Sequence, residues 1–125
     1  MGDLPSYETA FDNTPPAEVR IVNPTTGGQK GSKLGRFDLV PSRPLELLAE
    51  HYGRGAEKYE SRNWERGYNW GLSFAAMMRH AWAFWRGEDI DPETGSPHLV
   101  AVAWHAFALL EFGRTCPQLD DRSKP

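Results

Sequence analysis

The sequence predicts an all-α protein, a small helical bundle completed by oligomerisation and preceded by an irregular N-terminal arm. Three later segments carry apolar side chains at the helical spacing i, i+3, i+4, i+7, whereas residues 1–29 show no such periodicity. With 125 residues and a mass of 14.1 kDa, the chain has room for one small core. We therefore expect an arm over 1–29, a helical domain over 30–114 and a polar tail over 115–125.

Composition argues against several classes of protein. The net charge of −3 disfavours binding to a nucleic-acid polymer. No stretch approaches the run of about 18 apolar residues that a membrane span needs. A single cysteine, Cys116, excludes an internal disulfide and a cysteine-rich zinc site. The first ten residues lack the basic and apolar regions of a secretory signal, so we expect a cytoplasmic protein.

The first helix is expected to begin near Ser42, a residue type that suits the N-cap position. Apolar residues at helical spacing follow it, among them Leu45 and Leu48. Glycine weakens helices, so this one is expected to end near Gly53 and Gly55.

Two further helices are expected after a loop rich in aromatic residues. Ser73 is the predicted N-cap of the second, which Gly87 ends, and Ser96 is the predicted N-cap of the third. The third segment, residues 98–112, is apolar on nearly every side and is expected to end at Gly113. Such a helix needs neighbours all round, so we expect a partner subunit to complete the bundle, in a dimer or tetramer.

Two groups of acidic residues are candidate metal ligands. Glu46 and Glu50 are four residues apart and share one helical face, where like charges repel unless a cation lies between them. Glu88, Asp91 and Glu93 fall in one acidic turn. Carboxylate oxygens suit Mg²⁺ or Mn²⁺. A solvated acidic surface is the alternative for each group.

Two histidines border the acidic turn. His80 lies beside Arg79 on the second helix, and His98 opens the third. Each is a candidate ligand or a partner that orients a carboxylate, with a structural role as the alternative. His105, two turns further on, is expected to be structural.

A basic loop in this acidic protein is a candidate phosphate site. Lys30, Lys33 and Arg36 recur every three residues among glycines, which let the backbone approach an anion closely. The loop lacks the pattern of a P-loop. A solvated linker is the alternative.

The loop after the first helix offers groups that can bind a nucleobase. The ring of Tyr59 or Trp64 can stack on a base, and the amide of Asn63 can contact its edge. Lys58 adds a positive charge nearby. The alternative is a loop fixed in place by its own aromatic side chains.

Three strings carry a resemblance to a known family. They are KGSKLGRFDLVP, GAEKYESRNWERG and RHAWAFWRGEDIDPETGSPHL, within residues 28–112. In these strings the chain resembles the phage dATP/dGTP diphosphohydrolase family (MazZ-type), relatives of the MazG-like all-α nucleotide pyrophosphohydrolases.

The resemblance implies an activity and a setting. Such enzymes are Mg²⁺- or Mn²⁺-dependent helical oligomers that hydrolyse a purine deoxynucleoside triphosphate, dGTP or dATP, to the monophosphate and pyrophosphate. A phage-encoded member would act in the host cytoplasm. The wider class carries an E-x-x-E helix followed by an E-x-x-D helix. Here Glu57 and Glu60 fit the first pattern, and Glu88 and Asp91 the second.

These readings combine into one hypothesis for catalysis. Carboxylates from two helical segments hold the ion, one of them takes a proton from water, and basic side chains hold the β and γ phosphates. The ion would be held by Glu46, Glu50, Glu88 and Asp91, with Glu93 in reserve and Glu50 as the base; the substrate would be bound by Lys30, Lys33, Arg36, Lys58, Tyr59, Asn63, Trp64, Arg79, His80 and His98.

Two alternatives remain open. His80, Asp91 and His98 can form the metal centre of an HD-type phosphohydrolase, for which triphosphate release would be the signature. The chain can also be a non-catalytic helical module that binds nucleotides without turnover.

Overall fold

The computed structural model describes residues 7–12 and 17–124, and within these ranges the chain is mostly helical. Three long helices form the body: α2 (Ser42–Lys58), α3 (Trp70–Trp85) and α4 (His98–Thr115). The predicted all-α class is confirmed. None of the described helices combines the length and apolar character that crossing a membrane requires.

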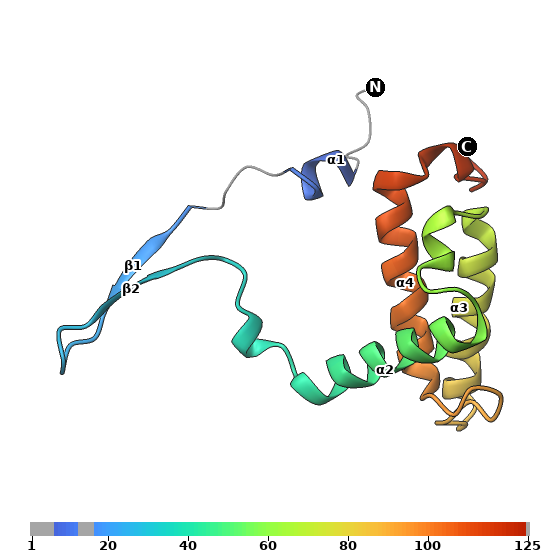
Figure 1. The fold of residues 1–125 in the computed structure, drawn as a ribbon, viewed down its shortest axis with the longest axis horizontal. Coiled ribbons are helices and arrows are strands. Elements are labelled where there is room, and N and C mark those ends of the chain that lie inside the picture. The colour runs from blue at the N-terminus through green and yellow to red at the C-terminus, as the bar shows by residue number, and fades with distance from the viewer. Residues whose placement is uncertain (1–6, 13–16, 125) are drawn as a thin grey trace.

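The helices α3 and α4 lie antiparallel and side by side, and the core sits near the carboxyl end of α4 (Figure 1). Phe112 is fully buried there between Trp70 and Cys116. The indole of Trp70 donates a hydrogen bond to the backbone oxygen of Cys116 at 3.1 Å. Cys116 is a free, buried thiol.

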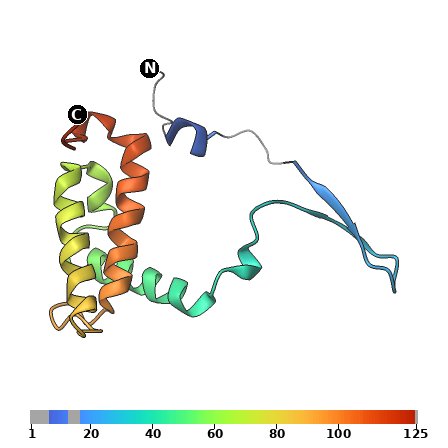
Figure 2. The ribbon, with the colours of Figure 1, turned by 180° about the vertical axis from the view of Figure 1, so that it is seen from behind.

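The helix α2 packs its second half against α4, while its first half projects away from the body (Figures 1 and 2). The predicted end at Gly53 and Gly55 is wrong, because the helix continues to Lys58. Burial of one face against α4 outweighs the roughly 1 kcal/mol that a glycine costs in a helix. Ser42 lies inside the helix, whose N-cap is Pro41.

The predicted caps Ser73 and Ser96 have other roles. The N-cap of α3 is Asn69, and that of α4 is Pro97. Both serine side chains are buried and bind groups far away in the sequence, as described below. Gly113 also lies within α4 rather than at its end; it faces the ring of Tyr7 in a short helix, α1 (Tyr7–Ala10), where a Cβ would have no room.

The described part of the N-terminal arm is irregular as predicted, apart from the short helix α1 and one hairpin. Strands β1 (Val19–Val22) and β2 (Gln29–Ser32) form an antiparallel hairpin. At its turn the side-chain oxygen of Asn23 accepts hydrogen bonds from two successive backbone amides at 2.9 and 3.0 Å. This hairpin was not identified from the sequence, because the apolar run of β1 is only four residues long. The part of that prediction on residues 1–6 and 13–16 lies outside the described residues.

Candidate metal centre and cleft

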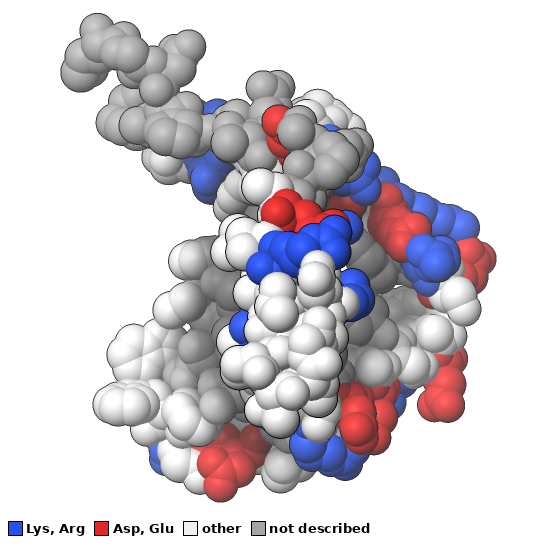
Figure 3. All heavy atoms as spheres, turned by 90° about the vertical axis from the view of Figure 1, so that its left-hand side faces the viewer, with Lys and Arg blue, Asp and Glu red and all other residues white. Residues whose placement is uncertain are grey.

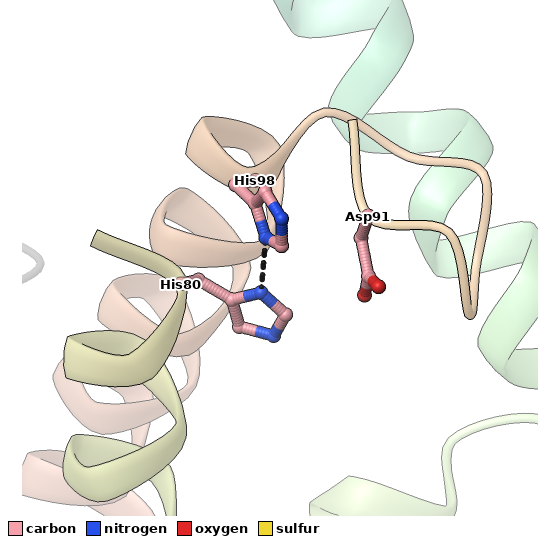
Figure 4. A group of neighbouring side chains, drawn as sticks. All are labelled: His80, Asp91 and His98. Atoms are coloured by element: carbon pink, nitrogen blue, oxygen red, sulfur yellow. Dashed lines mark hydrogen bonds between the residues drawn. The ribbon is translucent and has the colours of Figure 1, made fainter. Parts of the chain in front are cut away.

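Three potential metal ligands from separate parts of the chain meet beside the loop that joins α3 to α4. His80 comes from α3, Asp91 from the acidic loop, and His98 from the first turn of α4 (Figure 4). One ligand atom from each lies within 4.8 Å of the other two. The chain reversal between two antiparallel helices thus converts distant sequence positions into one donor set.

The two imidazoles meet through like atoms. Nδ1 of His80 lies 2.8 Å from Nδ1 of His98, and Nε2 of His98 lies 2.8 Å from a carboxylate oxygen of Glu88. Since an ionised carboxylate only accepts hydrogen bonds, Glu88 favours the proton of His98 on Nε2. That tautomer leaves the lone pair of Nδ1 facing His80. A carboxylate that orients a histidine in this way is a common support for a metal ligand.

Asp91 is buried, with only 7% of its surface exposed, and the loop around it supplies its hydrogen-bond partners. Its two carboxylate oxygens accept hydrogen bonds from the backbone amide of Glu93 at 3.0 Å and from the hydroxyl of Thr94 at 3.3 Å. The backbone amide of Asp91 donates to the oxygen of Ser96 at 2.9 Å, which closes the loop. These contacts fix the carboxylate beside the imidazoles without a cationic side-chain partner among the described residues.

Burial disfavours the charged form of two histidines here, His80 and His51. It lowers the pKa of His80, while the carboxylate of Asp91 opposes that shift. Burial likewise lowers the pKa of His51, and the nearby positive charge of Arg54 acts in the same direction. Neutral imidazole is the form that binds metals.

The donor set fits a divalent transition metal. Two imidazole nitrogens and one carboxylate suit Mn²⁺, Fe²⁺, Co²⁺ or Zn²⁺ better than Mg²⁺, which prefers oxygen ligands only. Two cis ligands at roughly 2.1 Å from one ion lie about 3 Å apart, close to the spacing of the two Nδ1 atoms. His80, Asp91 and His98 therefore form a group that can hold a metal ion.

A cleft of about 1490 Å³ opens next to this group. It runs between the second half of α2, the loop after it, and the face of α3 and α4 that carries the histidines. We call His80, Asp91 and His98 the metal-type group. His80 and Asp91 line the cleft, so the metal-type group lies at its wall. The volume is sufficient for a nucleotide-sized ligand.

A buried hydroxyl ties α2 to the acidic loop. The side chain of Ser96 accepts a hydrogen bond from Arg54 at 2.8 Å and lies 2.7 Å from Nδ1 of His51. Both partners line the cleft. Arg54 has no carboxylate partner among the described residues, so its charge remains available to an anion.

Aromatic side chains form one wall of the cleft, but they differ in exposure. The Trp64 ring packs against Trp104 at 6.2 Å and Phe112 at 6.0 Å between centroids, which joins it to the core. Tyr59, by contrast, is 58% exposed. Of the two rings predicted to stack on a base, Tyr59 is the more exposed, and Nζ of Lys58 lies over its ring at 5.3 Å from the centroid.

Behind the metal-type group, a polar chain crosses from α4 to α3. Nδ1 of His105 lies 3.0 Å from the Ser73 hydroxyl, which lies 2.5 Å from the hydroxyl of Tyr68. The ring of His105 stacks on that of His80 at 6.0 Å between centroids. Burial lowers the pKa of His105 to about 4, and the charges of His80 and His51 act in the same direction.

The structure brings together part of the predicted site. Seven candidates line the cleft: Lys58, Tyr59, Asn63, Trp64, His80, Asp91 and Glu93. Glu88 and His98 adjoin it through the contacts described above.

Other candidates lie elsewhere in this copy. Glu46 and Glu50 are exposed on the first half of α2, and both accept hydrogen bonds from Arg43, at 3.0 and 3.2 Å. Arg79 is exposed on α3 outside the cleft lining. The basic residues Lys30, Lys33 and Arg36 are on the arm, also outside that lining.

Some cleft residues were missed from the sequence, namely His51, Arg54, Thr94, Trp104 and His105. The spacing in the sequence could have identified two of these residues. His51 and Arg54 are three residues apart and so share a face of α2. Their link to Ser96, more than forty positions later, leaves no trace in local spacing.

Comparison with known proteins identifies the family. Residues 24–122 match the family model described as dATP/dGTP diphosphohydrolase, N-terminal, which spans the cleft and the metal-type group. No curated protein and no solved structure shows significant similarity to the chain. The chain therefore belongs to the dATP/dGTP diphosphohydrolase, N-terminal family, named for hydrolases of these two nucleotides.

Proposed function

We propose that the chain hydrolyses a purine deoxynucleoside triphosphate, dGTP or dATP, to the monophosphate and pyrophosphate with a divalent ion held by His80, Asp91 and His98. The observation that carries this proposal is the convergence of those three donors at the wall of a nucleotide-sized cleft. The family match supplies the substrate class.

The proposed reaction adds water across one phosphoanhydride bond. The water oxygen attacks the α-phosphorus, the bond to the bridging oxygen breaks, and pyrophosphate leaves. When bound, a divalent ion offsets the charge that develops on the phosphoryl oxygens and makes water more acidic. Asp91 and the two imidazoles would bind the ion, and Glu88 would keep His98 in the ligating tautomer.

The remaining cleft residues would bind the substrate. Arg54, which has no described carboxylate partner, would bind a phosphate, and Lys58 would add positive charge. Tyr59 would stack on the purine, and Asn63 would contact its edge. Substituting Tyr59→Ala should raise KM with little change in kcat, while Tyr59→Phe should behave like the wild type, because stacking uses the ring alone.

Glu46 and Glu50 remain a proposed second carboxylate pair, with Glu50 as a proposed base. Neither lines the cleft of its own chain, and both bind Arg43. Glu46→Gln and Glu50→Gln variants assayed beside Asp91→Asn decide the point. Loss of turnover in all three supports a shared centre, whereas normal turnover in the first two assigns the chemistry to the histidine group.

The decisive experiment is a panel of nucleoside triphosphates with Mn²⁺, Co²⁺ or Mg²⁺ and chromatographic separation of products. Pyrophosphate together with dGMP or dAMP supports the proposal. The His/Asp/His donor set favours one second candidate, an HD-type reaction, and this would release inorganic triphosphate and the deoxynucleoside. Binding of dGTP without any turnover would instead identify a non-catalytic nucleotide-binding module.

A further inference from the structure

The arm of residues 17–41 extends away from its own helical body (Figures 1 and 2). Large apolar side chains on it face solvent in a single copy, including Ile21 at 55% and Phe37 at 88% exposure. A two-stranded hairpin alone in water is only marginally stable. The arm therefore needs a surface to lie on, and its own body does not provide one.

The single copy also exposes more surface than a compact protein of its size. Its accessible area is 10050 Å², against about 6,700 Å² expected from its mass. The excess, about 3,300 Å², is comparable with the area that permanent protein interfaces bury. Part of the excess is the arm itself, and part is on the helices.

Apolar stripes on two helices lack a partner. Phe74, Met78, Trp82 and Trp85 on α3 are exposed and recur every three or four residues. A second exposed stripe runs along α4 through Leu99, Phe107 and Leu110. These surfaces favour a second copy of the chain as their partner, because a symmetric dimer pairs identical patches and can exchange identical arms.

Charge shows where the arm of that second copy fits. The cleft is lined by five carboxylates and only three cations, Arg54, Lys58 and Arg62. Two of these cations are near acids, since Arg62 pairs with Glu65 at 2.8 Å and Lys58 lies 4.0 Å from Glu93. A triphosphate carries more negative charge than Arg54 and one divalent ion can offset, so further cations would strengthen its binding.

The arm carries the complementary charge. Residues 17–41 include four cations and two carboxylates. Lys33 pairs with no described carboxylate, and Lys30 reaches only the neighbouring backbone oxygen of Gly31 at 3.4 Å. Seen from the arm's side, Lys and Arg side chains lie in the middle of the face beside acidic ones (Figure 3).

We propose that the arm of one copy lies across the cleft of a second copy and supplies Lys30 and Lys33 to the triphosphate bound there. This inference rests on the proposed function for the identity of the ligand. It accounts for three features at once: the unsupported hairpin, the acidic cleft, and the distance between the predicted basic loop and the metal-type group.

Complementation between two inactive copies tests the proposal. One copy carries His80→Ala, and the other carries Lys30→Ala with Lys33→Ala. The two are co-expressed with different tags, and the heterodimer is purified through both. If the arm acts in trans, one cleft in each heterodimer is intact, and about half of the wild-type rate returns. If the arm acts on its own cleft, the heterodimer stays as inactive as its parents, which overturns the proposal.

A second measurement does not depend on turnover. Lys33→Cys on one copy and Glu57→Cys in the cleft of the other should form a disulfide that joins the two tagged chains on a non-reducing gel. Ser123→Cys, outside the cleft lining, replaces Glu57→Cys as the control and should not crosslink. A crosslink without any hydrolysis of dGTP would support the placement of the arm on the second copy and refute the proposed function. Turnover without crosslink or complementation would support the proposed function and refute the placement of the arm.

Discussion

Nδ1 of His80 and Nδ1 of His98 face each other at 2.8 Å from two different helices. In the absence of a cation, one of the two nitrogens must donate a proton to the other. Because Glu88 holds the second nitrogen of His98, the pair has little freedom to turn away. A divalent ion can replace the shared proton and bind both lone pairs.

Metal binding should therefore stabilise the fold. We expect Mn²⁺ or Co²⁺ at a hundred times its Kd to raise the free energy of unfolding by about 2.7 kcal/mol, and Mg²⁺ at the same concentration to raise it less, because its Kd is higher. His80→Ala should abolish this effect, as measured by urea unfolding with and without the metal. Arg86→Ala, on the exposed end of α3, is the matched control and should respond like the wild type. Equal stabilisation of the wild type and His80→Ala would place the ion elsewhere.

Glu88 offers a test of positioning. Glu88→Gln keeps the size of the side chain but removes the charge that fixes the tautomer of His98, so metal affinity should fall about 10–100-fold. The adjacent Asp89→Asn removes the same charge without touching the His98 ring, and it should change affinity little. Isothermal titration with Mn²⁺ measures both. If the two variants weaken binding alike, Glu88 acts through general electrostatics and not through His98.

The helices could be predicted because their apolar faces depend on local spacing. Their starts could not, since Ser73 and Ser96 resemble caps in sequence but bind His105 and His51 across the fold. A cap and a buried hydroxyl use the same residue types, and only tertiary packing decides between them.

The candidate site, like the helices, could be predicted only where it depends on local spacing. The acidic turn and the two histidines beside it were identified from the sequence, because a short loop keeps neighbours together. The pairing of Glu46 and Glu50 with Arg43 was missed, although it gives that acidic face a local positive partner. Which of two acidic groups meets the histidines depends on how α2 packs, and local spacing carries no information about that.

Acid should weaken the fold through His105. Its pKa in the folded protein is about 4, below the value of about 6.5 expected in the unfolded chain. Above pH 6.5 the imidazole is neutral in both states. As pH falls from 6.5 towards 4, only the unfolded chain takes up the proton, so the free energy of unfolding decreases and then levels off.

The loss should be about 1–2 kcal/mol, because the ring keeps some contact with solvent and its shift is partly screened. Urea unfolding in EDTA at pH 7.5 and pH 4.5 measures it. His105→Gln can still bind Ser73 but does not titrate, so its stability should change less between the two pH values. An unchanged difference in this variant would assign the acid sensitivity to other groups.

Ser96 should link stability to substrate binding. Its buried hydroxyl contacts His51 at 2.7 Å and Arg54 at 2.8 Å, and it joins α2 to the acidic loop. Ser96→Ala removes the shared partner of both groups and should cost about 1–2 kcal/mol of unfolding free energy. Because Arg54 then loses its anchor, the KM for dGTP should rise several-fold. Ser61→Ala, an exposed serine in the same cleft, should leave stability unchanged.

Combining Ser96→Ala with Arg54→Ala should raise KM no further than Arg54→Ala alone, because both changes act through the same guanidinium. Additive effects on KM would show that Ser96 acts on the substrate by another route.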